Sequence, residues 1–174
     1  MTGLLAYDEL MWDNALASYR GERVSVQGRA RAFVGEDVRR FGSPRHPCPK
    51  LALVPGGGCE AVLFHVPSTD RRYLLHNLKQ REGRGTGRVA VRREGKRTRR
   101  VRCFQPGAAE RVWPDAASVV EGLKGARGAV GTGAEYVRTV VHAMELWEIR
   151  DPLVEEVWSE VQGWTAGRWA RDAV

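Results

Sequence analysis

The alternation of apolar and polar residues predicts strands in the first half of the chain. Residues 23–34 alternate with a period of two, as a strand with one buried face does, and Gly28 interrupts them as a bulge or bend would. Residues 4–6 predict a short opening strand, and the three prolines within residues 42–50 indicate a loop. Residues 51–67 predict two strands joined by a turn around residues 55–58, and the second of these is apolar enough to be central.

Apolar residues at helical spacing predict one helix among the strands and further helices after them. Residues 68–82 begin with residues that cap helices, place three leucines at positions 74, 75 and 78, and precede Gly83, which ends a helix well. The later segments predict a helix from Pro114 to about Leu123, a glycine-rich connector at 125–133, a helix at 134–149 and a last helix after Asp151 and Pro152.

Residues 88–104 predict a hairpin with two different faces. Val89, Val91, Val101 and Cys103 fall on one face, arginines occupy the other, and the turn lies near residues 94–95. Strands with one helix among them, followed by helices, predict an α+β fold: a small mixed β-barrel or barrel-like sheet flanked by helices, with a helical C-terminal third. We expect one domain over residues 1–162 and a C-terminal tail over 163–174 that docks through its tryptophans.

The net charge of the chain is concentrated in that hairpin. Residues 88–102 contain eight Lys/Arg and one Glu, so they carry the whole formal net charge of +7, and the rest of the chain is neutral. Such a segment can contact phosphates, although it has no interleaved aromatic residues for base stacking. The commoner explanation is a solvated edge hairpin that its charges protect from aggregation.

The three cysteines, at positions 48, 59 and 103, are widely spaced and show no metal-ligand pattern, and neither do the four histidines. No apolar run approaches the roughly 18 residues of a membrane span. Acidic residues interrupt the first apolar stretch, which is not typical of an export signal. We therefore expect a cytoplasmic protein without a membrane segment and without a metal or another cofactor.

Residues 7–10 place two acids inside an apolar run. Asp8 and Glu9 stand between Leu4–Ala6 and Leu10–Trp12. One interpretation is a solvated turn between a strand and a short helix. The other is that these two residues stand where a ligand binds.

Glu82 is the candidate catalytic residue. It follows Leu75 and Leu78 at helical spacing, so all three share one face of the helix at 68–82. The helix dipole disfavours a negative charge in the last turn, and burial disfavours it further. We expect both effects to raise the pKa of Glu82 toward the range of a general base near neutral pH, and Arg81 and Arg84 to lower it if they approach the carboxylate. The alternative is a frayed helix end from which the side chain reaches solvent.

The order of these segments resembles the ChaC-like γ-glutamylcyclotransferase family from about residue 4 to about residue 160. Four short motifs carry the resemblance: Tyr7-Asp8-Glu9-Leu10 with Trp12, where the family has Tyr-Gly-Ser-Leu and a tryptophan; Arg39-Arg40-Phe41; Leu78 with Arg81-Glu82; and a glycine-rich connector followed by Glu135-Tyr136. The resemblance implies a small mixed barrel flanked by helices. It also implies cleavage of glutathione or a related γ-glutamyl compound to 5-oxoproline and the free amine.

The resemblance further implies the roles of individual residues. Glu82 corresponds to the catalytic acid/base, and backbone amides of the loop at 7–10 to the cradle of the γ-glutamyl group. The residues expected to bind this small-molecule substrate are Tyr7, Asp8, Glu9, Leu10, Arg40 and Tyr136.

The acids at positions 8 and 9 replace glycine and serine of the family loop, and three hypotheses follow. The enzyme acts on glutathione with both acids turned outward. It acts on a different γ-glutamyl or amine-bearing substrate whose cation meets Asp8 or Glu9. Or it is an inactive relative that binds an anionic partner, such as nucleic acid, through the arginine-rich hairpin 88–102.

Overall fold

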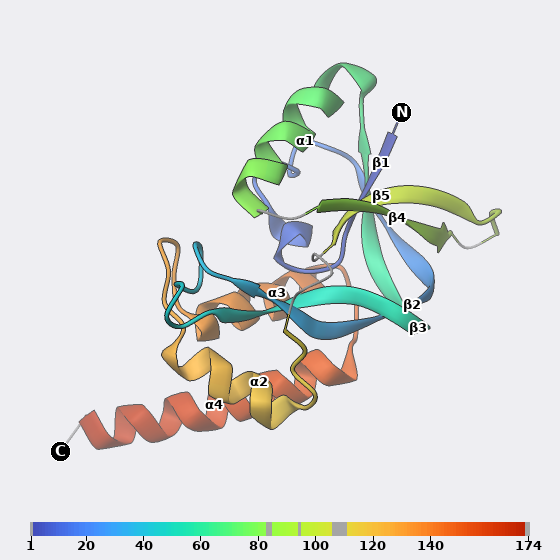
Figure 1. Cartoon of the computed structure of the whole chain (residues 1–174). Helices are drawn as coiled ribbons and strands as arrows, with labels where there is room; N and C mark the ends of the chain where they lie inside the picture. Colours follow the sequence, from blue (N-terminus) through green and yellow to red (C-terminus); the bar gives the residue numbers. More distant parts are fainter. Residues whose placement is uncertain (1, 83–84, 94, 106–110, 173–174) are drawn as a thin grey trace.

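The computed structural model describes residues 2–82, 85–93, 95–105 and 111–172, and the side chains of all of these except 2, 82 and 166–172. Its centre is a closed barrel of five strands in the order β1-β3-β2-β4-β5 (Figure 1). The strands are β1 (Thr2–Ala6), β2 (Gly21–Asp37), β3 (Cys48–Val66), β4 (Gly85–Arg92) and β5 (Arg99–Gln105). Neighbouring strands are antiparallel except β1 and β5, which are parallel, so the predicted mixed barrel is confirmed.

One prediction about the strands is wrong. Residues 51–67 do not form two strands joined by a turn, because β3 continues through that stretch and pairs with β2 along most of its length. The predicted bulge at Gly28 is confirmed: Gln27 pairs with Gly58 and Arg29 with Pro55, so the register shifts there. Gly28, Gly56 and Gly57 adopt positive φ angles, which bend the two strands together without breaking their pairing.

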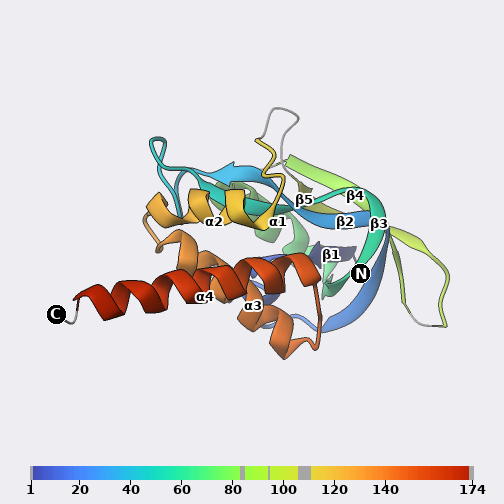
Figure 2. The same cartoon turned by 90° about the horizontal axis from the view of Figure 1, so that it is seen from below.

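Helix α1 (Ser68–Glu82) is confirmed with its predicted bounds and connects β3 to β4. It packs on the barrel through Leu74 and Leu78, which are buried. The helices α2 (Ala116–Gly125), α3 (Gly133–Leu146) and α4 (Pro152–Asp172) contact one another and lie on another side of the barrel (Figures 1 and 2). None of the described helices is long and apolar enough to cross a membrane.

The C-terminal residues differ from the expected tail. Helix α4 continues without interruption through Gly163 to Asp172, and Figure 2 shows it as one long element. Trp164 is half-buried and packs against the core, whereas the side chain of Trp169 lies outside the described residues. Asp151 begins this helix as predicted, since its carboxylate accepts a hydrogen bond from the amide of Val154.

Candidate functional site

The acidic stretch after β1 forms a buried 3-10 helix, η1 (Glu9–Trp12). Asp8 caps it by accepting a hydrogen bond from the amide of Leu10 at 3.1 Å. Asp8 is 1% exposed and Glu9 is 3% exposed, so the interpretation of this stretch as a solvated turn is wrong. The hypothesis that both acids turn outward is wrong for the same reason.

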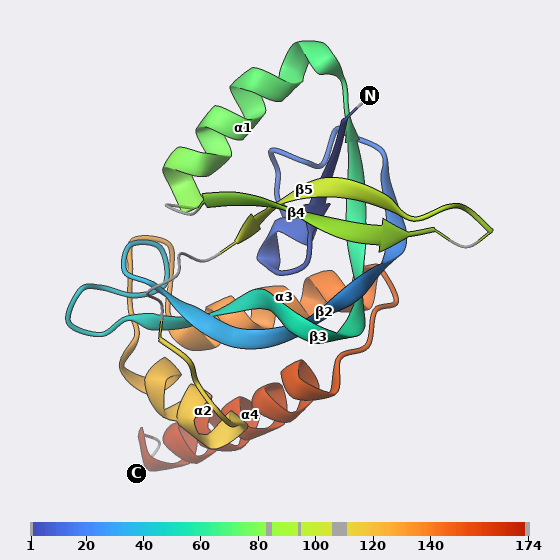
Figure 3. The ribbon, with the colours of Figure 1, turned by 45° about the vertical axis from the view of Figure 1, so that its right-hand side comes forward.

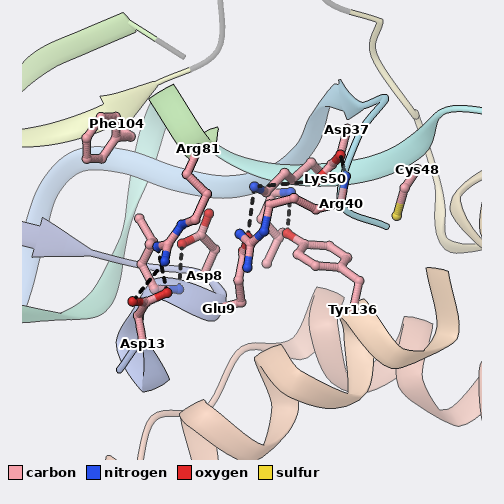
Figure 4. Close-up of polar contacts among 12 residues, drawn as sticks. Asp8, Glu9, Asp13, Asp37, Arg40, Cys48, Lys50, Arg81, Phe104 and Tyr136 are labelled. Atoms are coloured by element: carbon pink, nitrogen blue, oxygen red, sulfur yellow. Dashed lines mark hydrogen bonds and ion pairs between the residues drawn. The ribbon is translucent and has the colours of Figure 1, made fainter. Parts of the chain in front are cut away.

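The carboxylate of Glu9 lies between two cations (Figure 4). Its Oε1 is 2.8 Å from Nζ of Lys50 and 3.1 Å from Nη1 of Arg40. The side chains of Glu9 and Lys50 are each 2% exposed, and that of Arg40 is 16% exposed. A buried charge is tolerated only when it is paired in this way. The negative charge that Glu9 brings into the family loop is therefore compensated inside the protein.

Lys50 is the buried residue of this charge cluster that the sequence analysis did not identify. It stands near the start of β3 among residues that are buried on both sides, and its ammonium group lies 3.9 Å from Asp37 in addition to its contact with Glu9. The one indication in the sequence is the position of this cation directly before the apolar run at 51–54. A lysine that is buried with such a run requires an acidic partner. That partner is Glu9, 41 residues away in the chain, and only the barrel brings the two together.

A second buried ion pair holds the loop that precedes η1. Nε of Arg31 donates a hydrogen bond to the carbonyl of Tyr7 at 2.8 Å, and its Nη1 lies 3.1 Å from Asp151 at the start of α4. The side chain of Arg31 is fully buried. Because one guanidinium joins β2, the end of β1 and α4, it restricts the backbone of the loop at 7–10.

The segment that carries Arg40 is fixed from two sides. The carboxylate of Asp37 accepts hydrogen bonds from the backbone amides of Arg39 and Arg40, at 2.8 and 2.7 Å. The glycine-rich connector donates from the amide of Val130 to the carbonyl of Arg40 at 2.7 Å. A Cβ at Gly128 would collide with the backbone of Arg40, which explains why a glycine stands there.

Helix α1 brings its last turn to the same region. Nη2 of Arg81 lies 2.6 Å from Asp13, the residue that follows η1 (Figure 4). The backbone of α1 ends at the next residue, Glu82, whose side chain lies outside the described residues. The prediction that the Glu82 carboxylate faces the site is therefore not tested.

A cavity of about 450 Å³ opens between these elements. Residues from all four motifs on which the family resemblance rests line this cavity. Those motif residues are Glu9 and Trp12 from the first, Arg40 and Phe41 from the second, Arg81 from the third and Glu135 from the fourth. Asp13 and Arg138 also line it, so three guanidinium groups and three carboxylates surround a space of small-molecule size.

The other predicted binding residues, Tyr7, Asp8, Leu10 and Tyr136, are not among the described residues that line this cavity. Tyr7, Leu10 and Tyr136 are at most 2% exposed. The hydroxyl of Tyr7 donates to the carbonyl of Phe104 at 2.7 Å, and the hydroxyl of Tyr136 accepts from the amide of Leu51 at 3.0 Å. Both tyrosines thus position backbone around the site, while a direct contact of either with substrate stays a prediction.

The cysteines are poor nucleophiles in this setting. Burial is the main reason that the pKa of the Cys48 thiol is raised far above its ordinary value and that of Cys103 is raised to about 12. Burial likewise raises the pKa of Cys59. Within the described part of the chain, no group of three or more His, Cys, Asp or Glu residues is arranged to hold a metal ion.

The sequence matches a family model described as ChaC-like protein over residues 3–163. This match covers most of the chain. The chain belongs to the ChaC-like family. When this sequence is compared with curated proteins, none of them matches.

Solved structures of low sequence identity share the fold of this ChaC-like chain. A yeast γ-glutamylcyclotransferase specific to glutathione has a TM-score of 0.81 and 15% identity, over 93% of this chain and 96% of that one. A structure described as γ-glutamyl cyclotransferase has a TM-score of 0.51 and 12% identity, over 91% and 98% of the two chains. YkqA from Bacillus subtilis has a TM-score of 0.54 and 17% identity, over 92% of this chain and 54% of its own. The predicted fold class is confirmed.

Proposed function

We propose that this ChaC-like protein is a γ-glutamylcyclotransferase. It cleaves glutathione or a related γ-glutamyl compound by intramolecular cyclisation, and it releases 5-oxoproline and the free amine, Cys-Gly in the case of glutathione. The observation that carries the proposal is the charged cavity of about 450 Å³, because residues from all four family motifs line it. The name of the yeast structure, which shares the fold over nearly the whole chain, supports glutathione as the first substrate to test.

The reaction needs one group that moves protons, and we assign this role to Glu82. The substrate's own α-amine attacks its γ-carbonyl carbon, so a five-membered ring forms as the amide bond to the leaving nitrogen breaks. Glu82 accepts the proton that the amine loses and returns it to the leaving nitrogen. Neither a nucleophile from the enzyme nor a change of oxidation state is required. The last turn of α1 supports this assignment, since Arg81 lines the cavity directly before Glu82.

The remaining contribution of the protein is to hold the substrate folded. A chain bent so that its amine meets its own carbonyl gains the high effective molarity of an oriented intramolecular reaction. We assign stabilisation of the oxyanion to backbone amides of the loop at 7–10 other than that of Leu10, which donates to Asp8. Arg31 holds the Tyr7 carbonyl and so restricts the backbone of this loop. The guanidinium of Arg40, whose side chain is 16% exposed and lines the cavity, is suited to a substrate carboxylate and also pairs with Glu9.

The contacts of Glu9 indicate which charge a substrate needs to carry near this residue. The cations that meet Glu9 are Lys50 and Arg40 of the protein itself, so a cationic substrate is not needed to compensate its charge. Repulsion of the substrate's α-carboxylate by Glu9 is reduced for the same reason. We therefore keep glutathione as a candidate beside other γ-glutamyl compounds, and we expect their carboxylate to approach Arg40.

The test is product formation by matched variants. Purified protein is incubated with glutathione and with a panel of γ-glutamyl amines, and 5-oxoproline is measured by mass spectrometry. Glu82→Gln should lower the rate at least ~100-fold, the usual contribution of a general acid/base. The matched control is Glu121→Gln, an exposed position on α2 that lies outside the residues lining the cavity, and it should keep the wild-type rate.

Two results would contradict parts of the proposal. Activity retained in a folded Glu82→Gln protein would remove Glu82 from the reaction and leave the cyclotransferase assignment standing. Absence of 5-oxoproline from every substrate in the panel would remove the assignment itself and favour an inactive relative that acts by binding.

A further inference from the structure

The arginine-rich hairpin does not take part in the cavity. Strands β4 and β5 contribute no residue to the cavity lining among the residues that the structure describes. The hairpin projects away from the barrel at the end of these strands, as Figures 1 and 3 show. It also carries the whole formal net charge of the protein. A feature of this kind requires an explanation that is independent of the proposed reaction.

The strand register sorts the hairpin into a buried face and an arginine face. Val89 pairs with Val101, and these two side chains are buried together with Val91. Arg88 pairs with Arg102 and Ala90 with Arg100, so these residues project from the opposite face. Since Arg92 follows Arg88 and Ala90 in the same alternation, the outer face holds four guanidinium groups. They belong to Arg88, Arg92, Arg100 and Arg102.

Two of the hairpin cations are neutralised by the barrel. Arg93 and Arg99 lie 3.0 and 3.5 Å from the carboxylate of Glu22 on β2. The six others have no acidic partner in the parts of the chain that the structure describes, and all of them except the half-buried Arg102 are exposed. These six cations are Arg88, Arg92, Lys96, Arg97, Arg100 and Arg102.

Protection of a free sheet edge explains only part of this charge. The barrel is closed, so Arg102 on β5 pairs with Arg88 of β4 on one side and with Leu4 of β1 on the other. A closed barrel has no long free edge to guard. Like charges directly across a strand pair, such as Arg88 and Arg102, are destabilising. A bound polyanion would relieve this repulsion.

We propose that the β4–β5 hairpin binds the phosphate backbone of double-stranded DNA without sequence preference. A two-stranded ribbon fits the major groove of B-DNA, which is about 12 Å wide. Guanidinium groups two residues apart on one strand are separated by roughly 7 Å, a spacing that can reach successive phosphates along the duplex.

The composition of the hairpin favours duplex DNA over a single strand and over a membrane surface. Residues 85–103 contain no aromatic side chain, whereas sites for single strands stack bases on aromatic residues. The described residues of the loop at 93–98 carry no apolar side chain that could enter a membrane.

The test is the salt dependence of binding to a labelled 30-base-pair duplex, measured by fluorescence anisotropy with the full-length protein. If six phosphates are neutralised, the logarithm of the association constant falls with the logarithm of salt with a slope of about −5. The affinity then drops roughly 10³-fold between 50 and 200 mM salt. The variant Arg88→Gln/Arg92→Gln/Arg100→Gln should reduce that slope by about 3, because three contacts are lost.

Two further variants distinguish the hairpin from general positive charge. Lys124→Gln/Arg127→Gln/Arg150→Gln removes three exposed cations elsewhere and should leave the slope within about 1 of the wild type. Changing Arg88, Arg92 and Arg100 to lysine keeps their charges and should restore most of the affinity. Thermal unfolding of each variant shows whether the fold is retained.

The proposal is overturned if the protein does not bind the duplex at 50 mM salt, or if both glutamine variants weaken binding equally. It is also overturned if vesicles with anionic lipid bind the hairpin and the duplex does not, since the partner is then a membrane surface. None of these results depends on cyclotransferase activity, so the two proposals fail separately.

Discussion

Replacement of Lys50 by methionine tests whether the buried charge cluster holds η1 to the barrel. Methionine keeps the length and the apolar stem of lysine and removes the ammonium group, which lies 2.8 Å from Glu9 and 3.9 Å from Asp37. The side chains of Lys50 and Glu9 are each 2% exposed, so water cannot replace the lost cation. Glu9 then keeps Arg40, which is 16% exposed, as its cationic partner among the described residues.

Loss of one partner from a buried ion pair typically costs 3–5 kcal/mol. Because Arg40 still lies 3.1 Å from Glu9, we expect the lower end of that range, about 3 kcal/mol of unfolding free energy. For a domain of this size each kcal/mol corresponds to roughly 2–4 °C in the midpoint of thermal unfolding. The expected decrease in Tm is therefore about 6–12 °C.

The assay is equilibrium unfolding in urea, followed by tryptophan fluorescence, with Tm measured in parallel. The slope with urea should stay at the wild-type value if only stability changes. Lys79→Met, at an exposed position of α1, is the control and should change stability by at most about 0.5 kcal/mol. The double variant Lys50→Met/Glu9→Leu should recover most of the loss, because an apolar pair can replace a buried ion pair.

A loss below about 1 kcal/mol in Lys50→Met would refute the reasoning, since Lys50 and Glu9 would then behave like a surface ion pair. A double variant less stable than Lys50→Met alone would refute the account of Glu9 as a buried anion that depends on Lys50.

Three further predictions concern the capping, the thiols and the connector. Thr132→Ala should cost about 1 kcal/mol at pH 7. Hydrogen bonds with Thr132 lower the pKa of the Glu135 carboxyl below its ordinary value of 4.5. Their contribution to stability is therefore present above pH 4.5 and is lost as the pH falls through the lowered pKa. Urea unfolding at pH 7 and at acidic pH measures how the loss of stability in Thr132→Ala changes with pH. Cys103, with a pKa of about 12, should react with a thiol reagent at pH 8 only on unfolding, so fast labelling of native protein would contradict its burial. Gly128→Ala should lower Tm, because the new methyl group displaces the backbone of Arg40. It should also increase KM by a larger factor than it decreases kcat. An unchanged KM would show that this backbone does not position substrate.

Local rules account for the elements that the sequence predicted correctly. The period-two pattern of β2, the helical spacing of Leu74 and Leu78 in α1, and the valine face of the hairpin each depend on residues close in the chain. The prediction of a turn at 55–58 is wrong because glycines, which commonly end a strand, also permit a bulge within a strand. Only the pairing of β3 with β2 decides between these outcomes.

The sequence by itself determined the fold class, the family, the helix that ends at Glu82 and the concentration of positive charge at 88–102. The tertiary structure decided that Asp8 and Glu9 are buried, that Lys50 is the partner of Glu9, and that Glu22 pairs with two of the hairpin arginines, Arg93 and Arg99. Periodicity reports which face of an element is apolar. It does not report which distant side chain compensates a buried charge, because ion pairs such as Glu9–Lys50 exist only after barrel closure brings residues 41 positions apart within 2.8 Å.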